Sequence, residues 1–393
     1  MMVELKLKRG KEESLIRQHP WIFSGAIASA SGAVEDGDMV NVISSEDRFL
    51  ARGISATGSI AVRVLTFKDE KIDQQWWCKK IGNALSVRRA MNLVDNPETN
   101  CYRLINGEGD SLPGLVVDIY GSTAVVQAHA AGIYLMRHEI AAALMDTVGV
   151  RAVYDKSGST IPFQSGIEVH EGYIAGTKVE GERLLESGLT LLAAWEGGQK
   201  TGLFIDQRIN RQLVGRYAAG RRVLNTFCYT GGFSLAAIKG GALSVDSVDS
   251  SARAIELCAS NIAQNFPINQ SHSEITADAL NYIRDMPANK YDLIVLDPPA
   301  FAKHRQASAA ALKAYRRLNE SAIKKCAPGS IIFTFSCSQA VSREQFRMAV
   351  FSGAALAGRE VRILHFLSQG PDHPVNIYHP EGEYLKGLVL FVE

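Results

Sequence analysis

Short apolar runs separated by turns dominate the first 72 residues. Three of these runs are rich in β-branched residues, at 40–43, 49–53 and 60–65. Glycine-containing turns at 35–38 and 57–59 punctuate them, as is usual for consecutive strands. The pattern predicts a small β-barrel or sandwich over residues 1–72.

The pattern changes after residue 72. Residues 76–91 have helical character, the runs at 114–120 and 123–128 resemble strands, and a second helix is expected at about 134–148. These elements predict a small central α+β domain over residues 73–183.

From residue 184 to the end, strands alternate with helices, which predicts an α/β domain with a mostly parallel, doubly wound sheet. Five strands are expected at 222–226, 243–249, 274–277, 291–297 and 330–336. Two later runs, at 362–367 and 387–392, are expected to form a final antiparallel pair, which brings the sheet to seven strands.

Composition excludes several classes of protein. With 46% hydrophobic and 21% charged residues, the chain can bury a sizeable core and is not intrinsically disordered. No apolar run reaches the roughly 18 to 20 residues of a membrane span. The six cysteines form no C-x-x-C pair, so neither a zinc ribbon nor a disulfide framework is predicted. We expect a soluble cytoplasmic protein without a metal; the net charge of +1 does not by itself indicate a nucleic-acid partner.

A glycine pair follows the first strand of the α/β domain. The strand 223–227 leads into C-Y-T-G-G-F at 228–233, and Asp249 ends the next strand 18 positions after Gly231. An acid at that place commonly binds ribose hydroxyls, whereas Asp246 lies inside the strand. The loop lacks the G-x-G-x-x-G phosphate fingerprint, so S-adenosylmethionine fits better than a nicotinamide dinucleotide. The glycine loop alone is equally consistent with an ordinary strand-to-helix turn.

Two further strands end in residues that could take part in catalysis. Asp297 is followed by two prolines and Phe301, which offers a stacking face, and Cys337 lies between two serines at the end of the next strand. A thiolate that adds to carbon 6 of cytosine makes carbon 5 nucleophilic, and a carboxyl group near N3 can orient the base. This combination fits cytosine carbon-5 methylation. The other cysteines of the α/β domain, Cys228, Cys258 and Cys326, are expected to be structural.

Together these motifs resemble the RlmI-type methyltransferases, bacterial enzymes that form 5-methylcytosine in large-subunit ribosomal RNA. The resemblance is carried by residues 225–233, 248–251, 297–301 and 335–338, and also by 19–25, 102–110, 112–114, 198–208, 372–374 and 384–387. It implies a PUA-like RNA-binding β-barrel at 1–72, a central domain at 73–183 and a Rossmann-like class I methyltransferase domain at 184–393.

The resemblance also implies roles for individual residues. Cys337 would be the nucleophile and Asp297 would orient the cytosine. The cofactor, S-adenosylmethionine, would be bound by Phe204, Gln207, Asn225, Phe227, Tyr229, Thr230, Gly231, Gly232, Phe233, Asp249, Ser250, Asp278, Asp297 and Pro298. Ala300 stands where relatives often have lysine. As in this family, no second cysteine follows Asp-Pro-Pro, so the group that removes the carbon-5 proton is not identified.

Local charge favours an RNA partner. Two basic stretches adjoin the predicted site, and each could also be an ordinary solvated helix face: Lys303, Arg305, Lys313, Arg316 and Arg317 form one, and Arg208, Arg211, Arg216, Arg221 and Arg222 the other. The target cytosine in ribosomal RNA must be flipped out or single-stranded, because its carbons 5 and 6 are inaccessible in a duplex.

Two alternatives to cytosine carbon-5 methylation stay open on the sequence. One is methylation of an exocyclic amine by the Asp-Pro-Pro motif, which needs no thiol. The other is a non-catalytic RNA-binding factor of ribosome assembly. No membrane partner is expected. The sequence does not fix the oligomeric state, although homodimers are common among soluble enzymes.

Overall fold

The structure is a computed structural model that describes residues 2–162, 166–179, 181–193, 195–196, 201–268, 271–302 and 304–393. Its contacts divide the chain into two compact units. Unit 1 consists of Met1–Gly188, Ala193–Ile205 and Pro371–Gly382, and unit 2 of Leu189–Leu192, Asp206–Gly370 and Glu383–Glu393. The three-part division expected from the sequence, with boundaries at 72/73 and 183/184, stays a prediction. Among the described residues, no helix combines the length and the apolarity needed to cross a bilayer.

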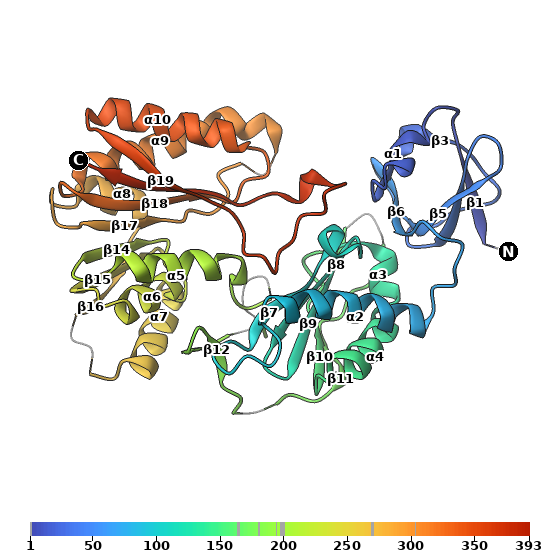
Figure 1. The fold of residues 1–393 in the computed structure, drawn as a ribbon, viewed down its shortest axis with the longest axis horizontal. Coiled ribbons are helices and arrows are strands. Elements are labelled where there is room, and N and C mark those ends of the chain that lie inside the picture. Colours follow the sequence, from blue (N-terminus) through green and yellow to red (C-terminus); the bar gives the residue numbers. More distant parts are fainter. Residues whose placement is uncertain are drawn as a thin grey trace. The chain divides into compact units, whose positions relative to one another are not determined.

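Unit 1 begins with a six-stranded sheet, blue in Figure 1, in the order β2-β6-β5-β4-β1-β3. The strands are β1 Val3–Leu7, β2 Trp21–Phe23, β3 Ile27–Ala30, β4 Met39–Ile43, β5 Phe49–Ser55 and β6 Ile60–Thr66; the short helix α1 is Glu13–Ile16. Alternate positions are buried on β4, at Val40 and Val42, and on β6, at Val62 and Val64. This sheet confirms the all-β character expected of the first 72 residues.

The second part of unit 1 is a five-stranded sheet in the order β11-β10-β9-β8-β7. Its strands are β7 Cys101–Asn106, β8 Leu115–Tyr120, β9 Thr123–Ala128, β10 Ala152–Asp155 and β11 Gly172–Gly176; strand β12 is Leu184–Glu186, and the helices are α2 Gln74–Ala90, α3 Ala131–Leu135 and α4 Arg137–Val148. Helices α2 and α4 pack side by side and cover the sheet (Figure 1). Asp73 caps α2 by accepting a hydrogen bond from the Trp76 N–H.

A short late segment, residues 371–382 with the 3-10 turn η6 Pro380–Gly382, completes unit 1. Arg88, fully buried on α2, donates to the Asp372 carbonyl at 2.8 Å. The Asp372 carboxylate accepts the Arg103 N–H at 3.1 Å, and the Pro374 carbonyl accepts the Asn106 amide at 3.1 Å. These bonds fix the segment on the central sheet.

Unit 2 is built on a seven-stranded sheet in the order β16-β15-β14-β17-β18-β20-β19. Its strands are β14 Arg222–Thr226, β15 Ser244–Asp249, β16 His272–Thr276, β17 Leu293–Leu296, β18 Ser330–Ser336, β19 Val361–Leu367 and β20 Lys386–Val392; strand β13 is Leu189–Leu191. The first five are parallel, and β20 is antiparallel to both β18 and β19. The predicted seven strands and the final antiparallel pair are therefore confirmed.

Helices cover both faces of this sheet (Figure 1). They are α5 Arg208–Tyr217, α6 Gly232–Lys239, α7 Ala252–Asn265, α8 Ala279–Asp285, α9 Ser308–Lys325 and α10 Arg343–Ala357. Leu224 and Ile332 point into the core formed with α8, α9 and α10, whereas their neighbours Val223 and Phe333 point into the core formed with α5 and α6. The central strands β17 and β18 are buried at every position, and β17 is a continuous apolar run.

Candidate functional site

Strands β17 and β18 are neighbours in parallel register, so their carboxyl ends meet at one edge of the sheet. Asp297 follows β17 directly, and Cys337 follows β18. The Cys337 thiol donates a weak hydrogen bond to the Pro298 carbonyl, with Sγ 3.9 Å from the oxygen. The structure thus brings together the thiol and the Asp-Pro-Pro segment that the sequence analysis placed at one site.

The residues on both sides of Cys337 fix its backbone. The Ser336 hydroxyl donates to the Tyr315 hydroxyl at 2.9 Å, and the Ser338 hydroxyl donates to the Ala302 carbonyl at 2.5 Å. Both serines are buried, whereas Cys337 is partly exposed. Cys337 packs against the hydrophobic core of Phe233 and Phe335 and remains partly exposed.

Lys386 is a buried cation beside the thiol. It begins β20 opposite Ser336, is 4% exposed, and donates from Nζ to the carbonyls of Ser338 (2.6 Å) and Val341 (2.8 Å). Burial lowers the pKa of Lys386 to about 8, and the nearby Cys337, when ionised, acts in the opposite direction. The attraction is mutual, because an ammonium that gains from a thiolate stabilises that thiolate equally.

Asp297 is oriented by a buried chain of amides. Gln207, which is 3% exposed, donates from Nε2 to Asp297 Oδ1 at 3.1 Å. Asn210 donates to Gln207 Oε1 at 2.6 Å and to the Ser368 carbonyl at 3.1 Å, which fixes the direction of the Gln207 amide. Two residues assigned to the site for different reasons, Gln207 and Asp297, therefore act as a pair.

The glycine loop contains unusual backbone. Phe227 and Tyr229 have positive φ angles of 55° and 49°, a conformation that costs a residue with a side chain roughly 1–2 kcal/mol. Asp249 supports the loop, because its Oδ2 accepts the Tyr229 N–H and its Oδ1 the Ser251 N–H, both at 2.9 Å. Gly231 has φ +83°, and a Cβ there would lie 2.4 Å from Cys258 Sγ. Strain concentrated in such a loop is typical of a ligand-binding segment.

This loop fits a nucleoside. Asp249 is partly exposed at the end of β15, and each carboxylate oxygen that holds the loop retains a second lone pair for a ribose hydroxyl. Asp278 lies exposed at the end of the next strand, where its side chain caps α8 through the Asn281 N–H at 2.8 Å. Ser250 is exposed beside Asp249. The roles of Asp249, Ser250 and Asp278 toward S-adenosylmethionine stay predictions.

Some residues assigned to the cofactor face the interior instead. Asn225 is fully buried and donates to the Ser234 hydroxyl at 2.8 Å, and Phe233 is 6% exposed and stacks on Phe335. Thr230 and Pro298 are also buried. Asp246 accepts hydrogen bonds from Lys290 and the Tyr291 hydroxyl, so it belongs to the core, as its position inside the strand predicted.

Other assigned residues have mixed surroundings. Phe301 is partly buried with its ring 4.8 Å from Tyr315, so one part of its stacking face is occupied. Gly232 begins α6 close to Arg211. Phe204 lies in unit 1, and residues 198–200 of the predicted cofactor segment lie outside the described residues. The cofactor roles of these residues stay predictions.

The expected basic rim at residues 206–222 is wrong in part. Arg208 and Arg211 are buried, being 2% and 8% exposed. Arg221 donates to the Asp292 and Gly329 carbonyls, and Arg222 pairs with Asp292 at the amino end of the sheet, away from the site. A count of charges along the chain could not separate these buried arginines from solvated ones. On α9, Lys313 and Arg317 are exposed, as the second basic stretch requires. Residue 303 is not described.

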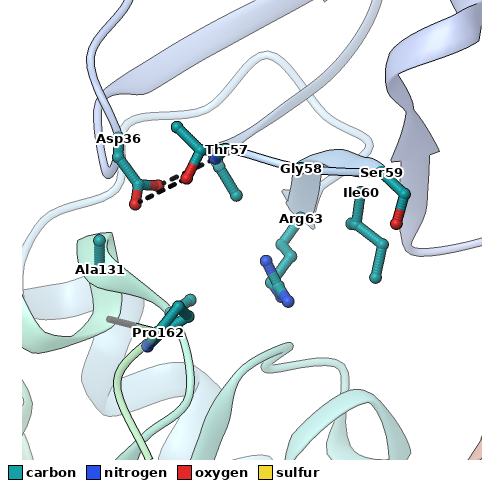
Figure 2. Close-up of a pocket in the computed structure, with 10 residues that line it drawn as sticks. Asp36, Thr57, Gly58, Ser59, Ile60, Arg63, Ala131 and Pro162 are labelled. Carbon is teal, nitrogen blue, oxygen red and sulfur yellow. Dashed lines mark hydrogen bonds between the residues drawn. The ribbon is translucent and has the colours of Figure 1, made fainter. Parts of the chain in front are cut away.

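A pocket of about 220 Å³ lies elsewhere, in unit 1, next to β6 (Figure 2). Arg63 reaches into it, and burial lowers the pKa of Arg63. Asp36 lies on another side, where it accepts hydrogen bonds from Thr57. The pocket holds neither the thiol nor the glycine loop, so we do not assign it to the reaction.

The fold and the strand-end site define the class of protein. A family model described as S-adenosylmethionine-dependent methyltransferase matches residues 164–377, and a PUA-like domain model matches residues 5–67. The protein is therefore an S-adenosylmethionine-dependent methyltransferase with an amino-terminal PUA-like domain. This agrees with the predicted fold class and the predicted cofactor.

The chain belongs to the ribosomal RNA large subunit methyltransferase I family. It is 38% identical over 397 residues to that protein of Tolumonas auensis and 38% identical over 395 residues to that of Aeromonas salmonicida, with 99% of each chain covered. Two solved structures share the fold over the full length of both chains at 24% identity: a methyltransferase from Streptococcus mutans (TM-score 0.83) and a methyltransferase complexed with SAH (TM-score 0.84). The family resemblance drawn from the sequence motifs is thereby confirmed.

Sequence reasoning missed two residues of the site. Lys386 was noted only as part of a motif near the end of the chain, and because lysine is rarely buried, the sequence pattern does not predict that it is. Asn210 gave no signal, because its role depends on the contact of α5 with the loop at Ser368.

Proposed function

We propose that this protein methylates carbon 5 of a cytosine in large-subunit (23S) ribosomal RNA through a covalent bond between Cys337 and carbon 6. The observation that carries the proposal is the Cys337 thiol, partly exposed, against the Pro298 carbonyl and beside Asp297. A methyltransferase of exocyclic amines has no need of a fixed thiol at that place. The RNA substrate is the one that the names of the relatives give.

The reaction follows from these groups. The Cys337 thiolate adds to carbon 6, and the electron pair of the carbon 5–carbon 6 double bond moves onto carbon 5. When bound, S-adenosylmethionine supplies the electrophilic methyl group that carbon 5 takes up. Loss of the carbon-5 proton then restores the double bond, and the pair returning to it expels the thiolate. The residue that accepts the proton is not assigned.

Asp297 and Lys386 have complementary roles in this scheme. The Gln207 amide orients Asp297 through Oδ1, and the protonated carboxyl group donates to N3 of the cytosine as negative charge develops on the ring. Lys386 is a positioning residue. It holds the Ser338 and Val341 carbonyls and favours the ionised state of Cys337 by its charge.

The direct test follows the hydrogen on carbon 5. A 23S ribosomal RNA transcript made with [5-³H]cytidine is incubated with the full-length protein and S-adenosylmethionine. Methylation of carbon 5 must release one tritium into water for each methyl group transferred. A small-subunit transcript serves as the control. Methyl transfer without tritium release would identify the exocyclic-amine reaction, and absence of transfer to any ribosomal RNA would favour a non-catalytic factor.

Replacing Lys386 by Met should slow the alkylation of Cys337. Loss of one nearby positive charge lowers the thiolate fraction, so we expect roughly ten-fold slower reaction with iodoacetamide at neutral pH. Because the pKa of Lys386 is about 8, its charge is present below that pH and is lost above it. The difference between the native protein and the variant should therefore shrink as the pH rises past about 8. Peptide mass spectrometry resolves the rate at Cys337.

The matched control for Lys386 is Lys325→Met. Lys325 also donates to a backbone carbonyl, that of Met286 at 3.0 Å, but it lies on α9 away from the thiol. This variant should alkylate Cys337 at the native rate. If Cys337 were alkylated at the same rate in the native protein and in Lys386→Met across the pH range, Lys386 would have no role in activating the thiol.

A further inference from the structure

Two histidines and a glutamate far apart in sequence meet in unit 1. His19 precedes β2, and His379 and Glu381 lie on the 371–382 segment. Glu381 Oε2 is 3.7 Å from His19 Nε2 and 3.8 Å from His379 Nε2. One ligand atom from each residue lies within 4.8 Å of the other two, and no other group of three among the described residues meets this criterion.

His379 is the unusual member of this group. It is 3% exposed, yet neither ring nitrogen has a hydrogen-bond partner. A buried polar group left without a partner costs about 1–3 kcal/mol. The Trp21 ring packs edge-on against the imidazole, with centroids 4.2 Å apart, and its N–H is directed to Glu108, so it does not satisfy His379. A ligand that accepts an imidazole lone pair would remove this cost.

His19 can present the required nitrogen. Its Nδ1 lies 3.3 Å from the Trp21 carbonyl and 3.2 Å from the Trp21 N–H. In the tautomer with hydrogen on Nδ1, the ring donates to the Trp21 carbonyl in place of accepting the Trp21 N–H, and Nε2 offers its lone pair toward Glu381. A backbone carbonyl that holds the far side of a ligating imidazole is the usual arrangement at metal sites.

From these contacts we propose that His19, His379 and Glu381 bind one zinc ion. Two imidazoles and a carboxylate are ligands that zinc accepts, with bonds of about 2.0–2.2 Å and donor atoms about 3.3–3.5 Å apart in a tetrahedron. The two separations from Glu381, 3.7 and 3.8 Å, need to close by only a few tenths of an ångström, and the histidine nitrogens lie within 4.8 Å of each other. Glu381 has a side chain 51% exposed, so it can make this adjustment and leave the fourth position open to water.

Packing agrees with this assignment. The segment that carries two ligands is already fixed on the central sheet by the hydrogen bonds of Asp372 and Pro374. Bound zinc would add a link from that segment to the β-barrel through His19. The site could not be predicted from the sequence, because His19 lies 360 positions before His379.

The test is zinc binding by the full-length protein. Protein stripped with EDTA is dialysed against zinc chloride, and bound metal is measured by mass spectrometry. We expect one zinc for each chain, and at least ten-fold weaker binding in Glu381→Gln, an exposed change that preserves the fold, and in His379→Ala. His170→Ala, which removes an exposed histidine outside the cluster, should bind as the native protein does.

Cobalt distinguishes this site from the free thiols, because thiolate ligands add intense charge-transfer bands that imidazole and carboxylate lack. A cobalt complex with only ligand-field bands, lost in Glu381→Gln, is the expected spectrum. Zinc binding that is absent, or unchanged in both variants, would overturn the proposal.

Discussion

Cys337→Ala should abolish methylation. Carbon 5 of cytosine is too weak a nucleophile to take a methyl group until sulfur has added to carbon 6, so we expect the single-turnover rate to fall by at least about 10⁴-fold, the scale on which removal of a nucleophile acts. S-adenosylmethionine binding should persist, because the glycine loop and Asp249 are untouched. Transfer of a labelled methyl group to 23S ribosomal RNA measures the rate, and calorimetry measures cofactor binding.

A trapped adduct gives the same variant a second readout. RNA that contains 5-fluorocytidine cannot lose a proton from carbon 5, so native protein should remain attached to it on a denaturing gel. Cys337→Ala should give no such band. Cys78→Ala, which removes a partly exposed thiol on α2 in unit 1, is the matched control and should form the adduct normally. If the Cys337→Ala protein still methylated RNA, methylation of an exocyclic amine would be favoured over methylation of carbon 5.

Arg88→Met should destabilise unit 1 by about 3–5 kcal/mol. The Arg88 guanidinium is fully buried, and it donates to both carboxylate oxygens of Asp110 and to the carbonyls of Arg103 and Asp372, the last two at 2.8 Å. Methionine fills a similar volume but leaves the Asp110 charge and two carbonyls without these donors. The loss is larger than for a surface ion pair, because water cannot replace the lost bonds.

Tryptophan fluorescence isolates this effect. All four tryptophans, Trp21, Trp76, Trp77 and Trp195, lie in unit 1, so denaturant unfolding followed by their emission reports on that unit. Arg89→Met, one position further along α2 at an exposed site, should change stability by less than about 0.5 kcal/mol. Equal unfolding midpoints for the two variants would show that the Arg88 network contributes little.

The sequence specified most of unit 2, because parallel strands buried on both faces leave a strong apolar signal. The adjacency of Asp297 and Cys337 followed from strand order alone, since the ends of consecutive parallel strands meet at one edge. The sequence did not predict which side chains would be buried and which would be exposed. Asn225 on β14 and Phe233 on α6 flank the glycine loop but are buried, and Arg208 and Arg211 are buried on α5.

What could not be predicted depends on contacts distant in the chain. Lys386 reaches Ser338 across paired strands, and the Gln207 amide is oriented by Asn210, which also binds the Ser368 carbonyl. The 371–382 segment carries residues that looked like part of the α/β domain, yet it packs in unit 1. The local sequence pattern predicts neither these side-chain contacts nor the packing of the segment, because both depend on the complete fold.

The interleaved path of the chain limits what deletions can reveal. A fragment that starts at residue 206 still carries the 371–382 segment, but Asp372 and Pro374 have lost the Arg103 N–H and the Asn106 amide that hold them. A fragment that stops at residue 205 deprives Arg88 of one of its acceptors. Either truncation could therefore abolish activity in two ways: by removing an RNA contact, or by breaking the hydrogen bonds that hold the 371–382 segment. Point substitutions are therefore the sounder means of assigning roles to the two units.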